Sequence, residues 1–178
     1  MQGRSDDFYE AVRSLRVVRA FRPDPIPDAA LQDILQAGRW TGSSKNLQGW
    51  ALIVIDDSDE LDRLASAGRF SDPIRASAAS IALVKTAEGN DFDIGRLAQN
   101  LMLAAATRGV GSCPVTLHDT ARAGEVLGLP DGAECHYAIA LGFPDEERER
   151  ARRAERRERG VAGRKPVDEI VHRGGWDA

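Results

Sequence analysis

The sequence predicts an α+β domain, with α/β-like alternation, in which helices flank a sheet. Three aliphatic runs have the length of buried strands: ALIVI at 51–55, SIALV at 80–84 and HYAIALG at 136–142. Segments with helical spacing of apolar residues lie before and between these runs, which is typical of a helix-covered sheet. We expect a single domain over 1–178, because a chain of 178 residues is long enough to bury one core.

Two helices are expected before the first strand. Apolar residues recur at three- and four-residue spacing over 6–15, which predicts a short helix with one buried face. That face consists of Phe8, Val12 and Leu15. The segment FRPDPIP at 21–27 ends this helix, because proline has no amide proton and restricts the residue before it. Asp28 is placed to cap a second helix, whose apolar stripe runs from Leu31 to Gly38.

The loop TGSSKNLQGW at 41–50 joins the second helix to the first strand and consists mostly of small and amide side chains. Its uncharged hydrogen-bonding side chains are Ser43, Ser44, Asn46 and Gln48. Such donors and acceptors suit the edge of a neutral heterocycle that alternates N–H and C=O groups. Gly, Ser and Asn also populate ordinary helix-to-strand connections, so the residue types alone do not distinguish the two interpretations.

The rest of the chain alternates helices with the two remaining strands. A short helix is expected at 61–64, and a longer one over 93–105 that ends before Gly109. Residues 145–160, DEERERARRAERRERG, predict a charged, solvated helix because acids and arginines pair at i, i+4 spacing. The tail at 161–178 regains apolar residues and is expected to dock on another surface.

Charge and composition exclude several classes of partner. With 24 basic and 28 acidic residues the net charge is −4, so the chain as a whole does not attract nucleic acid or an anionic membrane. No window approaches the roughly 20 apolar residues that cross a bilayer. The N-terminus lacks the apolar stretch of a secretory signal, which predicts a cytoplasmic location.

Cysteine and histidine spacing predicts neither disulfides nor a metal site. Cys113 and Cys135 belong to no C-x-x-C pair and are expected to be reduced, buried thiols. The three histidines have no close Cys or His partner, so metal ligation is not expected. GVGSCP at 109–114 follows a helix and has Pro114 in place of a third glycine, which argues against a Rossmann dinucleotide site.

Basic residues near both ends of the chain are candidates for binding a phosphate. They are Arg16, Arg19 and Arg22 near the start, and Arg164 and Lys165 near the end. The planar fork of arginine matches phosphate oxygens, so their convergence would create a strong anion site. In a chain this rich in arginine, each of them is equally well explained as a surface side chain.

Five segments in this order resemble the nitroreductase family of FMN-dependent oxidoreductases. They are RVVRAF with PDPIP, TGSSKNLQGWALIVI, RLAQNLMLAAATRGVGSCPVTL, LGLPDGAECHYAIALGFPDE and GRKPVDEIVH. The resemblance implies a mixed sheet flanked by helices, in an intertwined homodimer whose C-terminal tails are exchanged. It also implies FMN as cofactor and NADH or NADPH as reductant.

The resemblance further implies which residues form the flavin site. They are Arg16, Val17, Arg19, Ser43, Ser44, Asn46, Gln48, Pro114, Val115, Thr116, Leu117, Arg164 and Lys165. The basic side chains would hold the phosphate, and the polar residues of 43–48 would line the pocket, some from the partner subunit. The backbone of 114–117 would pass the ring, with an N–H near Thr116 facing flavin N5. No side chain is then needed as a catalytic acid or base, because the cofactor carries the chemistry.

The implied reaction passes hydride from NAD(P)H through flavin N5 to a small acceptor, such as a nitroaromatic or a quinone, in a ping-pong cycle. Leu15 and Val17 stand where the family often has arginine and serine, and this departure leaves open a flavin-binding protein without turnover. A third hypothesis is a nucleic-acid-associated domain that uses 148–159. Gly42 and Gly49 replace prolines of the family motif.

Overall fold

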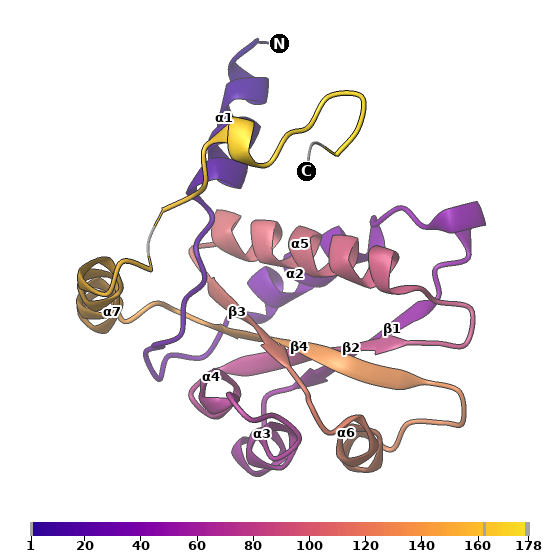
Figure 1. Cartoon of the computed structure of the whole chain (residues 1–178). Helices are drawn as coiled ribbons and strands as arrows, with labels where there is room; N and C mark the ends of the chain where they lie inside the picture. The colour runs from indigo at the N-terminus through magenta and orange to yellow at the C-terminus, as the bar shows by residue number, and fades with distance from the viewer. Residues whose placement is uncertain (1, 162, 177–178) are drawn as a thin grey trace. The chain divides into compact units, whose positions relative to one another are not determined.

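The computed structural model describes residues 2–161 and 163–176. Contacts within the chain divide it into two compact units, one that ends at Asp145 and one that begins at Glu146. Each unit is described by itself. The expected α+β class is confirmed in the first unit, where helices lie on both faces of a four-stranded sheet (Figure 1).

The sheet has the strand order β1-β2-β4-β3, and every neighbouring pair is antiparallel. Its strands are β1 (Trp50–Ile55), β2 (Ala79–Lys85), β3 (Gly111–Thr116) and β4 (Glu134–Gly142). The four strands thus form an antiparallel sheet rather than the mixed one that was expected. An isolated parallel bridge joins Val17 to Ser112 at the outer edge of β3. The three aliphatic runs became β1, β2 and β4 as expected, but β1 is an edge strand in which only Ile55 is buried. Strand β3 was not anticipated from the sequence.

Two helices cover one face of the sheet (Figure 1): α2 (Asp28–Arg39) and α5 (Asp91–Thr107). The core beneath them is formed by aliphatic side chains such as Ile34, Leu97, Leu101 and Ile139. Gly38 lets the two helices approach closely, because a Cβ there would fall 2.7 Å from Leu101 Cδ2.

Three shorter helices cover the other face (Figure 1): α3 (Ser58–Ala65), α4 (Asp72–Arg75) and α6 (Thr120–Leu127). Their core contains Leu64, Ile74 and Ala123, all fully buried. Aspartates cap two of them, because Asp57 accepts the N–H groups of residues 59 and 60, and Asp119 accepts that of residue 122. Helices α4 and α6 were not anticipated from the sequence.

Two expectations about the first helices need correction. Asp28 is the first residue of α2 rather than its cap, because the extended Pro27 precedes it and no side-chain capping bond forms. Helix α1 (Gln2–Ser14) forms as predicted, but Phe8 and Val12 are 64% and 45% exposed. Only Leu15, just after the helix, packs against the core, so the apolar face of α1 is not buried within this chain.

The second unit contains α7 (Glu146–Glu158) and a short 3-10 turn, η2 (Val167–Glu169). The charged segment is helical as predicted, and Glu155 pairs with Arg159 at 3.4 Å. Apolar residues of the tail are exposed, including Ile170 and Trp176, so its docking remains a prediction. Residues 162, 177 and 178 of that tail lie outside the described residues. Among the helices of the described residues, none is both long enough and apolar enough to span a bilayer.

Candidate functional site

The segment that carries Arg16 and Arg19 runs along the start of β3. The Val18 N–H donates to Ser112 O at 2.9 Å, beside the parallel bridge between Val17 and Ser112. The backbones approach closely here, since a Cβ on Gly111 would fall 2.8 Å from Val18 Cβ. Leu15 and Val17 pack against the core. Leu15 and Val17, which stand where the family motif often has arginine and serine, therefore contribute to the packing of the core.

Arg16 and Arg19 flank this bridge. Arg16 is exposed, and its Nη1 donates to the carbonyl oxygens of Arg13 and Leu15 at 2.6 and 2.8 Å. A guanidinium has five N–H donors, so most of those on Arg16 remain available for a ligand. Arg19 is half-buried. Arg22 is already engaged, because it pairs with Asp24 at 3.4 Å and lies over a phenylalanine ring.

The outer edge of β3 beyond the bridge offers one backbone N–H. Ser112 O faces away from β4 to accept Val18, and alternate residues of a strand face the same way, so Pro114 and Thr116 face outward too. Proline has no amide proton, which leaves Thr116 as the donor. The next N–H, that of Leu117, turns back to His136 O at 2.9 Å. Thr116 lies four residues, or about 13 Å, from the bridge at Ser112.

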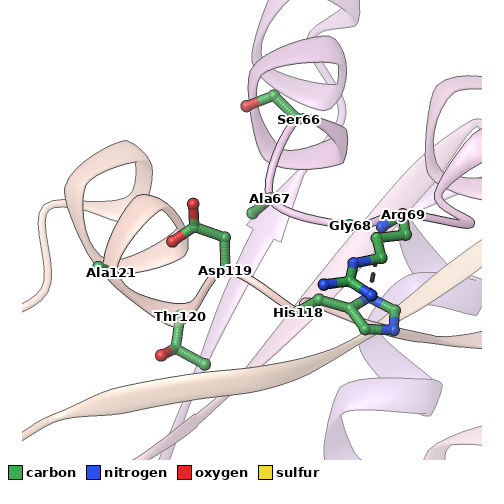
Figure 2. A pocket seen from close by; sticks show the side chains of 8 residues that line it. All are labelled: Ser66, Ala67, Gly68, Arg69, His118, Asp119, Thr120 and Ala121. Atoms are coloured by element: carbon green, nitrogen blue, oxygen red, sulfur yellow. Dashed lines mark hydrogen bonds between the residues drawn. The ribbon is translucent and has the colours of Figure 1, made fainter.

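A cavity of about 470 Å³ lies at this end of β3, lined by residues 66–69 and 118–121 (Figure 2). The Arg69 N–H donates to His118 Nδ1 at 3.3 Å, so a neutral His118 carries its proton on Nε2. The loop 66–69 lies directly against the end of β3, because a Cβ on Gly68 would fall 3.1 Å from Thr116 O. The ring of the exposed Phe70 lies near that of His118, with centroids 6.2 Å apart and an angle of 71° between the ring planes.

Sequence reasoning did not find this cavity. Arg69 and His118 are 49 residues apart, and each looks like an isolated polar residue in a loop. Only the pairing of β3 with β4 and the packing of α3 bring them together. Within the described residues the Arg69 side chain forms no salt bridge.

The predicted ring-holding loop, residues 43–48, has an unusual backbone. Lys45, Asn46 and Gln48 have φ angles of 52°, 55° and 50°, in the left-handed region that residues with a Cβ rarely adopt. The Gln48 N–H donates to Ser43 Oγ at 2.9 Å, which closes the loop on itself. Ser43 is half-buried, whereas the polar side chains after it are exposed.

One chain does not bring all predicted site residues together. The 43–48 loop leads into β1, whereas Arg16, Arg19 and Thr116 lie along β3. The strand order places β1 and β3 at opposite edges of the sheet, three strand spacings or about 14 Å apart. Arg164 and Lys165 belong to the second unit, where Arg164 Nη1 donates to the neighbouring Gly163 O.

A charged cluster lies where β2 ends and β4 begins. Lys85 Nζ contacts Asp91 Oδ1 at 3.0 Å and Glu134 Oε2 at 3.4 Å, and His136 Nε2 lies 3.0 Å from the same glutamate oxygen. The hydrogen bond to Asp91 raises the pKa of Lys85. The pKa of Asp91 is lowered by Lys85, and that of Glu134 is lowered by His136 and then by Lys85.

Both cysteines are free and buried, as expected. Burial raises the pKa of the Cys135 thiol to about 11, so it is protonated and unreactive at neutral pH. In the described part of the chain, no group of three His, Cys, Asp or Glu residues is placed to hold a metal ion.

The chain resembles known proteins in both sequence and fold. The chain matches the model of the nitroreductase family over residues 12–85 and 81–143. It is 27% identical over 183 residues to the NADPH-flavin oxidoreductase of Vibrio harveyi, covering 92% of this chain and 72% of that protein. The 4-nitrobenzoate reductase of Pseudomonas putida is 26% identical over 202 residues, with 80% of this chain and 87% of that protein covered. The structure of the Vibrio harveyi NADPH:FMN oxidoreductase complexed with NAD⁺ matches at a TM-score of 0.82 and 25% identity, covering 96% of this chain and 78% of that one.

Proposed function

The chain belongs to the nitroreductase family, and we propose that it is an FMN-dependent enzyme that passes hydride from NADH or NADPH to a small acceptor. Nitroaromatics and quinones are the acceptor classes that we propose. The names of the Vibrio and Pseudomonas relatives, a flavin oxidoreductase and a nitrobenzoate reductase, support this assignment.

The observation that carries the proposal is the outer edge of β3. Arg16 and Arg19 flank one end of this edge, and Thr116 offers an outward N–H at the other, about 13 Å away. An elongated cofactor with a phosphate at one end and a hydrogen-bonding ring at the other fits such an edge. These residues therefore suit FMN.

Bound FMN would supply the redox chemistry, accepting hydride from NAD(P)H and delivering it to the acceptor in two alternating half-reactions. The protein would hold and orient the reactants. Arg16 and Arg19, together with Arg164 and Lys165, would neutralise the phosphate. The Thr116 N–H would donate to N5, which fixes the ring against the strand. The cavity beside Thr116 would provide room for a planar acceptor next to the flavin ring.

We further propose that the active form is a homodimer in which the 43–48 loop of each subunit completes the flavin site of its partner. The separation of this loop from β3 within one chain supports the proposal. Exposed apolar residues on α1 and in the tail provide surface for such an association.

Absorption spectroscopy on the purified protein tests the cofactor. We expect a yellow protein, or one that becomes yellow with added FMN, and a flavin band that bleaches when NADH or NADPH is added without oxygen. A nitroaromatic or a quinone should then restore the band. A protein that binds FMN but is bleached by neither reductant would instead be a flavin-binding protein without turnover, and one that binds no FMN would contradict both flavin functions.

A further inference from the structure

Asp93 is a buried carboxylate in the first turn of α5, with only 5% of its surface exposed. Its Oδ2 accepts hydrogen bonds from Asn90 Nδ2 at 2.8 Å and from the Ser44 N–H at 3.2 Å. Its Oδ1 lies 3.5 Å from Arg96 Nη1. A buried charge persists only where its surroundings satisfy it, and here one of the three donors comes from the 43–48 loop.

The bond to Ser44 spans 49 residues and holds the segment whose backbone is least favourable. Lys45, Asn46 and Gln48 all occupy the left-handed region. Such conformations are costly for residues with a Cβ, and they persist only where neighbouring structure determines them. Local bonds close the loop on itself, but they do not attach it to the body of the protein.

Helix α5 also contacts Thr41 and Gly42, the two residues just before the 43–48 loop. Asn100 Nδ2 donates to Thr41 Oγ1 at 2.8 Å, about two turns along the helix from Asp93. The Arg96 side chain lies against the backbone of Gly42, where a Cβ would fall 2.8 Å from Nη2. Asp93, Arg96 and Asn100 thus form one row on α5 that contacts residues 41–44, and Asp93 is the member of that row that bonds to the 43–48 loop itself.

We propose that Asp93 is a positioning residue that holds the 43–48 loop in the conformation that receives the flavin ring. The identity of the ligand rests on the function proposed above, whereas the dependence of the loop on Asp93 does not. An amide at this position keeps the size of the side chain. It loses the charge that attracts Arg96. Its NH2 group also takes the place of one of the two oxygens, so in either orientation a donor faces a donor: Arg96 on one side, or Ser44 and Asn90 on the other.

The test compares Asp93→Asn with Asp91→Asn in the full-length protein. Asp91 lies in the same turn but is exposed and pairs with Lys85 instead of the loop. In flavin-free protein we expect Asp93→Asn to speed amide hydrogen exchange at residues 44–48 at least tenfold. We expect the same variant to weaken FMN binding at least tenfold, and Asp91→Asn to change both quantities less than twofold. Unchanged exchange in Asp93→Asn would overturn the proposal.

A rescue variant separates loop positioning from a general loosening of α5. Glycine adopts the left-handed conformation without a Cβ penalty, so Lys45→Gly should make the loop less dependent on its anchor. We expect Lys45→Gly to restore FMN affinity at least threefold in the Asp93→Asn background. No restoration would indicate that Asp93 acts on α5 as a whole, which contradicts the proposal.

If Asp93→Asn does not fold, Ser44→Pro removes the same hydrogen bond from the loop side. Ser43 is already extended, with φ −134° and ψ 158°, which is the conformation that a following proline requires. Amide exchange at Gln48 should rise in Ser44→Pro relative to Ser44→Ala, and equal exchange would refute the role of the bond. A wild-type protein that binds no FMN would contradict the proposed function, and the exchange measurements would still decide the role of Asp93.

Discussion

Pro114 and Thr116 occupy equivalent outward positions on β3, but only Thr116 has an amide proton. Because proline is already accommodated at this edge, Thr116→Pro should remove one hydrogen-bond donor without breaking the strand. A net hydrogen bond contributes about 0.5–1.5 kcal/mol, so we expect FMN binding to weaken by up to about tenfold. Fluorescence titration measures the affinity. Thr116→Ala keeps the N–H and should bind like the wild type, and equal affinities of the two variants would contradict the proposed contact.

The cluster around Lys85 should make stability depend on pH on the acid side. The folded protein lowers the pKa of Asp91 and Glu134, so their contribution is present above the unfolded pKa and is lost as pH falls through the folded one. We expect Lys85→Met to lower Tm at pH 7 and to approach the wild-type Tm near pH 3. The raised pKa of Lys85 keeps its own contribution intact through neutral pH, and it is lost only at strongly alkaline pH.

Thermal unfolding across pH 3 to 8 measures this effect. Lys45→Met is the matched control, since Lys45 is exposed and forms no salt bridge within the described residues. A Tm difference between Lys85→Met and the wild type that stays constant over this range would show that the ion pairs do not cause it.

At the scale of elements, the pattern of apolar residues predicted the strands and helices whose side chains are buried in the core. The runs that became β2 and β4 and the helix at 93–105 are of this kind, whereas β1 is an edge strand in which Ile55 is the one buried residue. The sequence GSCPVT gives no such signal for β3, because its extended form comes from pairing with β4 and its proline is tolerated only at an edge. The loop residues proposed for the site come from the resemblance to a family motif. The Arg69 and His118 cavity exists only after packing and could not be read from spacing.

Gly49, near the end of the loop 41–50, lies against the turn between β2 and α5, which leaves no room for a side chain. A Cβ on Gly49 would fall 2.5 Å from the backbone N and Cα of Gly89, whereas a Cβ on Gly95, exposed on α5, would meet no atom within 4 Å. Backbone cannot move aside as a side-chain end can. We expect Gly49→Ala to lower the free energy of unfolding by about 1–3 kcal/mol.

Gly95→Ala is the opposite case and should raise the free energy of unfolding by about 0.5–1 kcal/mol, because alanine favours the helix. Urea denaturation measures both variants. Similar effects of the two substitutions would contradict the close approach of Gly49 to Gly89.

At the scale of the whole molecule, the exposed apolar face of α1 bears on assembly. Phe8 and Val12 lie on one side of a helix that contributes little to the core of its own chain. In the proposed homodimer this face is covered. We expect size-exclusion chromatography with light scattering to give twice the chain mass of 19.3 kDa. The double variant Phe8→Glu with Val12→Glu should shift the protein toward a single chain, because it places charge in a buried interface.

Glu10→Gln changes the charge of the same helix outside the apolar face and should leave the mass unchanged. A wild-type protein that runs at 19.3 kDa at micromolar concentration would contradict the dimer. A double variant that remains dimeric would place the interface elsewhere.

Strands β1 and β3 lie at opposite edges of the sheet, and in the proposed dimer this placement predicts that two different variant chains can complement each other. Each site would combine the β3 edge of one chain with the 43–48 loop of the other. When a Thr116→Pro chain pairs with an Asp93→Asn chain, one site receives both defects and the other receives none. At an FMN concentration that leaves the sites of both single variants mostly empty, co-expression of the two alleles should therefore yield heterodimers with half the wild-type activity, a form of interallelic complementation that a site built within one chain would not show.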